Sequence, residues 1–324
     1  MKRGVVVAVA TAAVAVSGAL GSSAAATPTG GAGARIPAPD FGSFVEEASL
    51  NPLKPRSSRA WSEPDWCAKR APLGDLARSY DPRDPRPTLL EIAKRRYPPA
   101  VPLIEAAPDD RLRYWLRPLP GKKNDLKSVV SLFANVVHEE GHALTWPGAN
   151  PPSVFAYRIV DDSSVVLVPG VEAYPRSQIL RRHPSPATDP YAKAYLEGPM
   201  GGQDIEMLTE EFVQYVHSLA SGFCAYDVPS NTRVSYRDGV LTHMWWMQMY
   251  LAVGRKHHPQ DYRAILANKA LVTVIIDTWR RAEHWLAKTR GTNYGIDDAA
   301  LLARVSRPAN KAEIDRLRRA LHQG

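Results

Sequence analysis

Several features that mark other classes of protein are missing from this chain of 324 residues. It contains no repeat with a period of about 20–50 residues, so a solenoid or a propeller is not indicated. No basic run is interleaved with aromatic residues, so we expect no nucleic-acid partner. The long apolar run at residues 4–20 is short for a membrane span, and we expect no stable insertion into a membrane.

Cysteine is scarce, because only Cys67 and Cys224 occur in the sequence. Neither lies near the start of the chain, so a lipid-anchored lipoprotein is not indicated. In an oxidising compartment the simple prediction is one disulfide bond between them, and the alternative is two unpaired buried thiols. The bond would close a loop of roughly 150 residues and stabilise the fold by about 5 kcal/mol in the chain-entropy model, less any strain.

The N-terminus is typical of a Sec-type export signal of the bacterial kind. Lys2 and Arg3 form a positive start, residues 4–20 form an apolar segment, and small residues at Ala24 and Ala26 offer a cleavage site. We therefore expect a secreted, extracellular and soluble mature protein.

The composition along the chain predicts three segments. Residues 1–26 are the signal peptide, and residues 27–60, rich in proline, glycine and alanine, are a flexible leader. Residues 61–324 form a single domain, because nothing in them marks an internal linker. The formal net charge is +8, with basic residues spread widely. A solvated basic surface is the simple interpretation, and a weak attraction to an anionic cell wall is the functional alternative.

Apolar periodicity predicts an α+β fold that is mostly helical. We expect a strand over residues 111–119, a β-hairpin over about 153–168 and a loop-rich segment over 169–203. The expected helices cover residues 88–97, a segment from a cap at Asn124 or Asp125 to about 144, then 204–220 with a stop near Gly222, and finally 238–257, 259–288 and 309–322.

The sequence His-Glu-Glu-Gly-His at residues 138–142 lies inside one of these predicted helices. Positions i and i+4 share a helix face about 6 Å apart, so His138 and His142 can both aim a ring nitrogen at one cation. Zinc accepts such nitrogen ligands at about 2.0–2.1 Å. Glu139 is turned by roughly 100° around the helix, which places it beside the ion to take a proton from water.

At these residues the chain resembles the zincin metallopeptidases, whose signature is His-Glu-x-x-His on an active-site helix. The resemblance is short, and it departs from the stricter pattern because Glu140 is charged; we expect Glu140 to point away from the metal. The resemblance implies a zincin-like active-site helix, which the expected fold combines with a small β-hairpin and a helical C-terminal half. It also implies one Zn²⁺ per chain and hydrolysis of peptide bonds by activated water, with Glu139 as the general base.

The third ligand is expected from a later helix. The metzincin pattern requires glycine at position 145 and histidine at position 148. This sequence has Thr145 and Gly148, so the pattern fails. Gluzincins instead supply a glutamate from a second helix, and residues 205–221 are the best candidate. Many gluzincins also place an aspartate four residues after this glutamate to orient a histidine. Here Gln214 or Tyr215 occupies that place.

Two glutamates compete for this role. Alignment with the gluzincin aminopeptidase pattern Asn-Glu-Gly-Phe-Ala-x-Tyr selects Glu210. Helix geometry favours Glu211, which lies on the flank of the predicted buried face, whereas Glu210 lies almost opposite with Glu206 and His217. Both remain candidate ligands.

A hydrogen-bond donor for the oxyanion is expected near the metal. Tyr215, His217 and His243 are the candidates, and each has a structural role as its alternative. The sequence thus predicts a secreted zinc metallopeptidase that acts on a peptide or protein substrate. The alternatives are a non-catalytic exported zinc-binding protein of zincin ancestry and a zinc amidase acting on cell-wall peptides. Glu139 favours an enzyme, since a non-catalytic site has no use for a base there.

Overall fold

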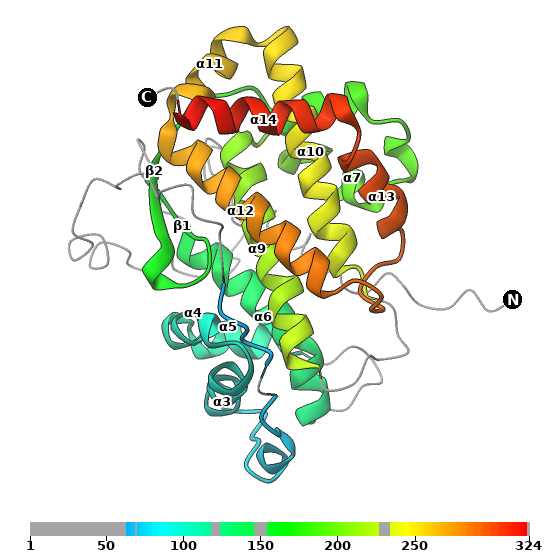
Figure 1. Cartoon of the computed structure of the whole chain (residues 1–324). Helices are drawn as coiled ribbons and strands as arrows, with labels where there is room; N and C mark the ends of the chain where they lie inside the picture. Colours follow the sequence, from blue (N-terminus) through cyan, green and yellow to red (C-terminus); the bar gives the residue numbers. More distant parts are fainter. Residues whose placement is uncertain (1–62, 69, 118–123, 146–153, 227–233, 323–324) are drawn as a thin grey trace, which may run out of the picture.

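The computed structural model describes residues 63–68, 70–117, 124–145, 154–226 and 234–322 (Figure 1). The predicted signal peptide, residues 1–26, lies outside these ranges, as does the leader at 27–60. The described part is mostly helical with a small two-stranded antiparallel sheet, as the sequence predicted. None of the described helices is both long and apolar enough to cross a membrane.

The helices cover most of the described residues. In chain order they are α3 (Arg86–Arg96), α4 (Val101–Ala106), α5 (Asp109–Trp115), α6 (Leu126–Thr145), α7 (Pro190–Tyr195), α8 (Gly198–Gly201), α9 (Ile205–Ala225), α10 (Tyr236–His257), α11 (Pro259–Ala267), α12 (Lys269–Lys288), α13 (Asp298–Val305) and α14 (Pro308–His322). The strands are β1 (Val154–Arg158) and β2 (Val165–Pro169). Short 3₁₀ segments lie between them: η1 (Gly74–Arg78), η2 (Pro98–Ala100), η3 (Asp162–Ser164), η4 (Arg176–Arg182) and η5 (Pro186–Thr188).

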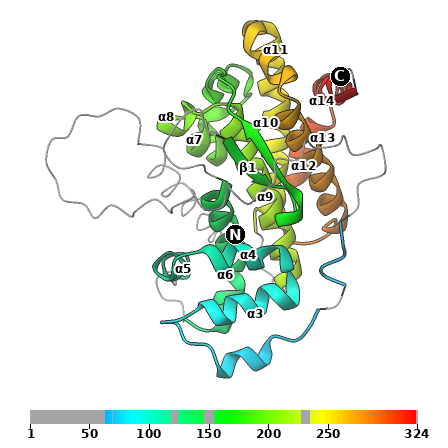
Figure 2. The same cartoon turned by 90° about the vertical axis from the view of Figure 1, so that its left-hand side faces the viewer.

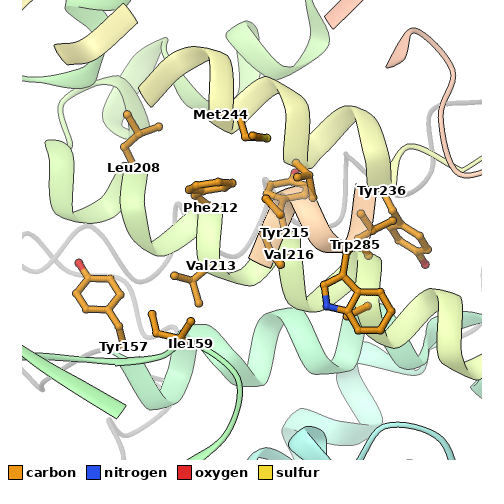
Figure 3. Packing of buried hydrophobic residues seen from close by; sticks show 14 of the residues in the cluster. Tyr157, Ile159, Leu208, Phe212, Val213, Tyr215, Val216, Tyr236, Met244 and Trp285 are labelled. Carbon is orange, nitrogen blue, oxygen red and sulfur yellow. The ribbon is translucent and has the colours of Figure 1, made fainter. Parts of the chain in front are cut away.

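Helix α9 forms the centre of the molecule, and α6, α10 and α12 pack around it (Figure 1). Its apolar residues Phe212, Val213 and Val216 are buried in the core, to which Met244 of α10 and Trp285 of α12 also belong (Figure 3). Burial of such side chains contributes about 1.5–3 kcal/mol each. A helix enclosed on several sides holds its side chains in fixed positions, which is what a metal site requires.

Helix α6 begins where a side chain caps it. Of the two predicted caps, Asp125 performs this role: its carboxylate accepts a hydrogen bond of 2.9 Å from the backbone N–H of Ser128. Asn124 instead accepts a hydrogen bond from the Tyr80 hydroxyl at 2.6 Å. The described part of the helix ends at Thr145, close to the predicted end at about residue 144.

The β-hairpin packs against α9 and against two of the helices that surround it. Strands β1 and β2 form an antiparallel hairpin (Figure 2). In its register Tyr157 lies opposite Val166. Strand β1 contacts α6 and α9, whereas β2 contacts α12. The Tyr157 hydroxyl donates to the backbone carbonyl of Glu206 at 3.0 Å, which fixes the hairpin to the first turn of α9.

The disulfide bond between Cys67 and Cys224 is present, as predicted, across a sequence separation of 157 residues. It joins the first described segment to the last turn of α9. Beside this segment, Arg281 of α12 donates two hydrogen bonds to the buried carboxylate of Glu63, at 2.9 and 3.0 Å. A covalent bond and a buried ion pair therefore hold the same stretch of chain against the helical core.

The strand predicted over residues 111–119 is wrong, because Asp109–Trp115 is helix α5. The buried residues are Leu112, Trp115 and Leu116, a spacing of three and four rather than two, while Tyr114 is 41% exposed. Two aspartates in the first turn also favour a helix N-terminus. The alternation of apolar and basic residues was therefore a misleading signal.

The helices differ from the prediction in four places. The helix expected over 259–288 is divided at Asn268, whose side chain caps α12 by accepting from the N–H of Leu271 at 3.1 Å. Helix α9 continues past Gly222 to Ala225. The segment expected to be loop-rich, residues 169–203, contains η4, η5, α7 and α8, and the sequence analysis did not anticipate α13.

Candidate metal site

Three side chains from two helices meet at one point. The ligand atoms of His138 and His142 on α6 and of Glu211 on α9 all lie within 4.8 Å of one another. A Glu211 oxygen lies 3.8 Å from Nε2 of His138 and 3.6 Å from Nε2 of His142. Ligands of a tetrahedral zinc ion at about 2.0–2.1 Å are roughly 3.3 Å apart. The group therefore needs only a small contraction to hold a metal ion.

The polar atoms of this group are buried and unsatisfied. Within the described part of the chain, no hydrogen bond reaches Nε2 of His138, Nε2 of His142 or either carboxylate oxygen of Glu211. One carboxylate oxygen of the neighbouring Glu139 also has no hydrogen-bond partner among the described residues. Folded proteins rarely leave buried polar atoms without a partner, because each costs about 1–3 kcal/mol. Five such atoms in one place fit a bound cation and water.

Two further residues of α9 fix the orientation of the histidine rings. Nδ1 of His138 lies 2.9 Å from the hydroxyl oxygen of Ser218. Nδ1 of His142 hydrogen-bonds to the carboxylate of Glu210. When each Nδ1–H donates to its oxygen, Nε2 keeps the lone pair that a metal ion requires. The three candidate ligands therefore come from α6 and α9, whereas the two residues that orient the histidine rings both come from α9.

The sequence placed Glu210 on the wrong side of α9. It is 1% exposed and faces α6, where Gln214 supports it with a hydrogen bond of 3.1 Å. The prediction assumed one buried face, but α9 is enclosed by neighbouring helices, so its opposite face is buried too. Glu206 and His217, expected on that outer face, are likewise buried. Glu211, the choice favoured by geometry, is the glutamate that joins the two histidines.

Two glycines allow the helices to approach this closely. A Cβ atom on Gly141, within the histidine motif, would lie only 1.9 Å from the side-chain oxygen of Gln214 on α9. A Cβ atom on Gly239 of α10 would lie 2.2 Å from the ring of Tyr215. A larger residue at either position would collide with a side chain of α9, so that Gln214 or Tyr215 would have to shift.

Glu140, the charged residue inside the motif, points away from the metal ligands, as expected. Its carboxylate accepts a hydrogen bond of 2.9 Å from Arg111 and one of 3.0 Å from the indole N–H of Trp115. Both partners come from the chain around α5. The second glutamate of the motif therefore fixes α6 to the rest of the fold.

The charges at the site favour a bound cation. Burial alone would lower the pKa of His142, but the carboxylates of Glu210 and Glu211 outweigh it and raise this pKa to about 10. Burial alone would raise the pKa of Glu211, but the positive His142 ring and the nearby His138 ring lower it to about 2. A proton or a metal ion is therefore held strongly between α6 and α9.

Glu139 has the environment of a proton acceptor. It is 4% exposed, and burial, aided by the nearby Glu211 carboxylate, raises its pKa to about 8. A carboxylate with a pKa near neutrality can both accept and return a proton. The residue directly after His138 is thus suited to general acid–base chemistry.

The structure brings two of the three predicted oxyanion donors close to the metal ligands. The ring of Tyr215 lies 4.9 Å from that of His138 and stacks on His243 at 4.6 Å, both measured between centroids. Nδ1 of His243 lies 2.9 Å from the carbonyl oxygen of Gly239, while its Nε2 is buried without a partner in the described chain. The Tyr215 hydroxyl shares a hydrogen bond of 2.9 Å with that of Tyr195.

His217 is not brought to the site. Arg281 donates to the hydroxyl of Tyr97, which donates in turn to Nδ1 of His217 at 2.8 Å. Nε2 of the same ring donates to the carbonyl of Arg158 at 3.0 Å. Both nitrogens are therefore occupied by the fold, and burial holds the pKa of this histidine well below its ordinary value.

The sequence analysis did not identify Ser218, Arg176 or Tyr195. Ser218 lies seven residues after Glu211, two helical turns along the same face, so helix spacing offered a usable signal. Arg176 lies in η4 and Tyr195 in α7, in a segment expected to be loop-rich. No periodic pattern there predicts which side chains turn inward.

Comparison of the chain with protein-family models, with curated proteins and with solved structures gives no match. The function is therefore argued from the site itself.

Proposed function

We propose that the protein is a zinc-dependent metallopeptidase that hydrolyses peptide bonds. The observation that carries the proposal is the position of Glu139, a buried carboxylate with an unpartnered oxygen directly beside the group of His138, His142 and Glu211. A site that only stored a metal ion would have no need for a buried base next to it. This arrangement supports the resemblance to the zincins.

Zinc is the metal that the donor set fits best. Two imidazoles and one carboxylate are the protein ligands of many catalytic zinc sites, which keep a fourth position open. Oxygen-rich sites suit calcium or magnesium instead. When bound, zinc supplies Lewis acidity that polarises a carbonyl group and acidifies water.

The residues of the chain then perform the proton transfers. Glu139 accepts a proton from the attacking water and returns it to the leaving nitrogen. The hydroxyl of Tyr215 is the group available to donate to the oxyanion. Nδ1 of His243 faces the carbonyl oxygen of Gly239, so Nε2 of the neutral ring carries a lone pair and cannot donate. Glu210 and Ser218 keep the two histidine rings oriented throughout.

The disulfide bond between Cys67 and Cys224 supports export, since such bonds persist mainly in oxidising compartments. We therefore propose a secreted enzyme whose partners are peptide or protein substrates. The basic composition is compatible with weak attraction to an anionic cell wall.

The test is metal analysis and peptide hydrolysis of the purified protein beside its Glu139→Gln variant. We expect about one zinc per chain in both, with hydrolysis of a casein-derived peptide mixture lost only in the variant. Glu140→Gln is the matched control: it removes a neighbouring carboxylate and should lower stability while keeping the activity of the folded fraction. Equal hydrolysis by the wild type and Glu139→Gln would refute the proposal.

Two outcomes would redirect the assignment. Zinc binding without any hydrolysis by the wild type would favour a non-catalytic zinc-binding protein. Release of amino groups from cell-wall peptides, without cleavage of ordinary peptides, would favour a zinc amidase.

A further inference from the structure

Within the described part of the chain, one buried arginine near the candidate metal ligands lacks hydrogen-bond partners for two of its three guanidinium nitrogens. Arg176, the first residue of η4, is fully buried. Its Nε donates to the carbonyl of Met200 at 2.8 Å, but neither Nη1 nor Nη2 has a hydrogen-bond partner within the described chain. An uncompensated buried charge is strongly unfavourable, so folded proteins rarely keep one without a use.

Other buried arginines of this chain show how the fold satisfies such a group. The guanidinium of Arg281 reaches both oxygens of Glu63, the carbonyl of Ile159 and the hydroxyl of Tyr97. Arg237 bonds to the carboxylate of Asp298. These guanidinium groups hold the structure together, whereas two nitrogen atoms of Arg176 have no hydrogen-bond partner among the described residues.

Arg176 is connected to the metal ligands through two tyrosines. Its guanidinium carbon lies 5.5 Å from the centre of the Tyr195 ring. The Tyr195 hydroxyl meets that of Tyr215 at 2.9 Å, and the Tyr215 ring contacts His138. Burial lowers the pKa of Arg176, while the charge of Glu211 opposes this shift, although the two side chains form no hydrogen bond within the described chain. The free nitrogens therefore lie near the site without belonging to the ligand group.

We propose that Arg176 binds the C-terminal carboxylate of the peptide substrate, so that the enzyme acts as a carboxypeptidase. This inference rests on the proposed function and names its substrate class. A guanidinium group forms two parallel hydrogen bonds with a carboxylate, which matches the two free Nη atoms. A terminal carboxylate lies one residue beyond the last peptide bond, a span of about 3.8 Å between Cα atoms. An anchor close to the metal ligands, but separate from them, suits this spacing.

The reaction adds one water molecule to the last peptide bond. The water oxygen forms a bond to the carbonyl carbon, the carbon–nitrogen bond breaks, and the proton passes through Glu139 to the leaving amine. The products are a free amino acid and a peptide shorter by one residue. Arg176 takes no part in these proton transfers and determines which bond is placed at the metal.

The activity test compares an N-acylated Phe-Phe dipeptide with the same dipeptide carrying a C-terminal amide. We expect the wild type to cleave the acid with a kcat/KM about 100-fold higher, the factor typical of one buried charge-paired hydrogen bond. Arg176→Met should lower cleavage of the acid by about 100-fold, and so remove the preference for the acid over the amide. Arg182→Met, an exposed arginine at the end of the same segment, should behave as the wild type.

A binding test makes the result independent of turnover. In zinc-loaded Glu139→Gln protein, 3-phenylpropanoate should bind at least about tenfold more tightly than its neutral amide in calorimetry, and Arg176→Met should abolish this preference. Thermal unfolding provides the check on folding. Because Arg176→Met removes an uncompensated charge, it should keep or raise the midpoint, whereas loss of a structural arginine would lower it.

The outcomes separate the two proposals. Equal cleavage of acid and amide by the wild type, or an equal loss of both in Arg176→Met, would overturn the carboxypeptidase assignment and leave the peptidase intact. If neither peptide is cleaved but 3-phenylpropanoate still binds through Arg176, the carboxylate site stands and the peptidase fails.

Discussion

One carboxylate oxygen of Glu211 lies 3.6 Å from Nε2 of His142, across the contact between α6 and α9. On the other side of the same imidazole ring, Nδ1 hydrogen-bonds to Glu210. Two glutamates that are adjacent in sequence therefore approach opposite nitrogens of one histidine. Under the proposed function, this arrangement makes Glu211 a metal ligand and Glu210 the group that orients His142, and these two roles predict different behaviour on mutation.

Replacing the two glutamates separately should separate ligation from orientation. We expect Glu211→Gln to release zinc at neutral pH, and Glu210→Gln to weaken zinc affinity by about 10–100-fold, as for other residues that orient metal ligands. Competition with a chromophoric chelator measures both. Glu206→Gln, on the preceding turn of α9, is the control and should keep the wild-type affinity. A larger loss in Glu210→Gln than in Glu211→Gln would contradict the assignment.

Ser218 should also contribute to zinc affinity by orienting a histidine ring, but less than Glu210 does. Its hydroxyl lies 2.9 Å from Nδ1 of His138, so Ser218→Ala removes the group that fixes this ring. We expect zinc affinity to fall by about tenfold with little change in thermal stability. Ser221→Ala provides a matched comparison, because the hydroxyl of Ser221 bonds to backbone carbonyls of α9. Equal affinities for the two variants would show that His138 needs no such support.

The disulfide bond should be a main source of stability. The double variant Cys67→Ser with Cys224→Ser removes a cross-link that spans 157 residues. We expect the free energy of unfolding to fall by about 2–5 kcal/mol, as is typical when a native disulfide is lost. Urea denaturation of the variant, beside the wild type with and without reductant, measures the change. An unchanged midpoint in all three samples would mean that the core alone holds the N-terminal segment.

The buried ion pair of Glu63 and Arg281 should make the free energy of unfolding depend on pH in the acid range. Burial raises the pKa of Glu63, but Arg281 outweighs it and holds the pKa below the ordinary value of 4.5. The folded state therefore binds this proton less readily than the unfolded state, so the contribution is complete above the ordinary pKa. It is lost as the pH falls below that value.

The corresponding measurement is unfolding of Glu63→Gln across the acid range. At pH 7 the variant should be less stable by about 3–5 kcal/mol, because Arg281 is left without its charge partner. Between about pH 5 and pH 3 its stability should fall less steeply than that of the wild type. Glu91→Gln, whose side chain is 40% exposed, should change stability by less than about 1 kcal/mol. Parallel acid profiles for Glu63→Gln and the wild type would disprove the role of the pair.

Local sequence patterns predicted the features that depend on one element. The cap, the apolar period and the breaker cluster defined α6, and the spacing of His138 and His142 then placed two ligands on one face. The same kind of reasoning failed for residues 111–119, where an alternating pattern concealed a helix with buried residues at spacings of three and four. Short amphipathic segments carry too few residues to separate the two periods.

Features that depend on neighbouring elements were harder to predict. Glu210 was assigned to an outer face because the sequence of α9 does not show that other helices enclose it. Arg176 comes close to the candidate metal ligands because η4 packs its first residue against two other segments. Its guanidinium group donates a hydrogen bond to the carbonyl of Met200 and lies over the ring of Tyr195. Such contacts join residues far apart in the sequence, and no local pattern encodes them.

The central position of α9 has a consequence for how this sequence can diverge. The same 21-residue helix supplies the middle of the core and the residues that hold the histidine rings. A substitution that alters packing along it also displaces Glu210, Glu211 or Ser218, so selection for foldability and selection for chemistry act on the same positions. We expect α9 to change more slowly over generations than peripheral helices such as α3 and α14, which tolerate drift because no ligand depends on them.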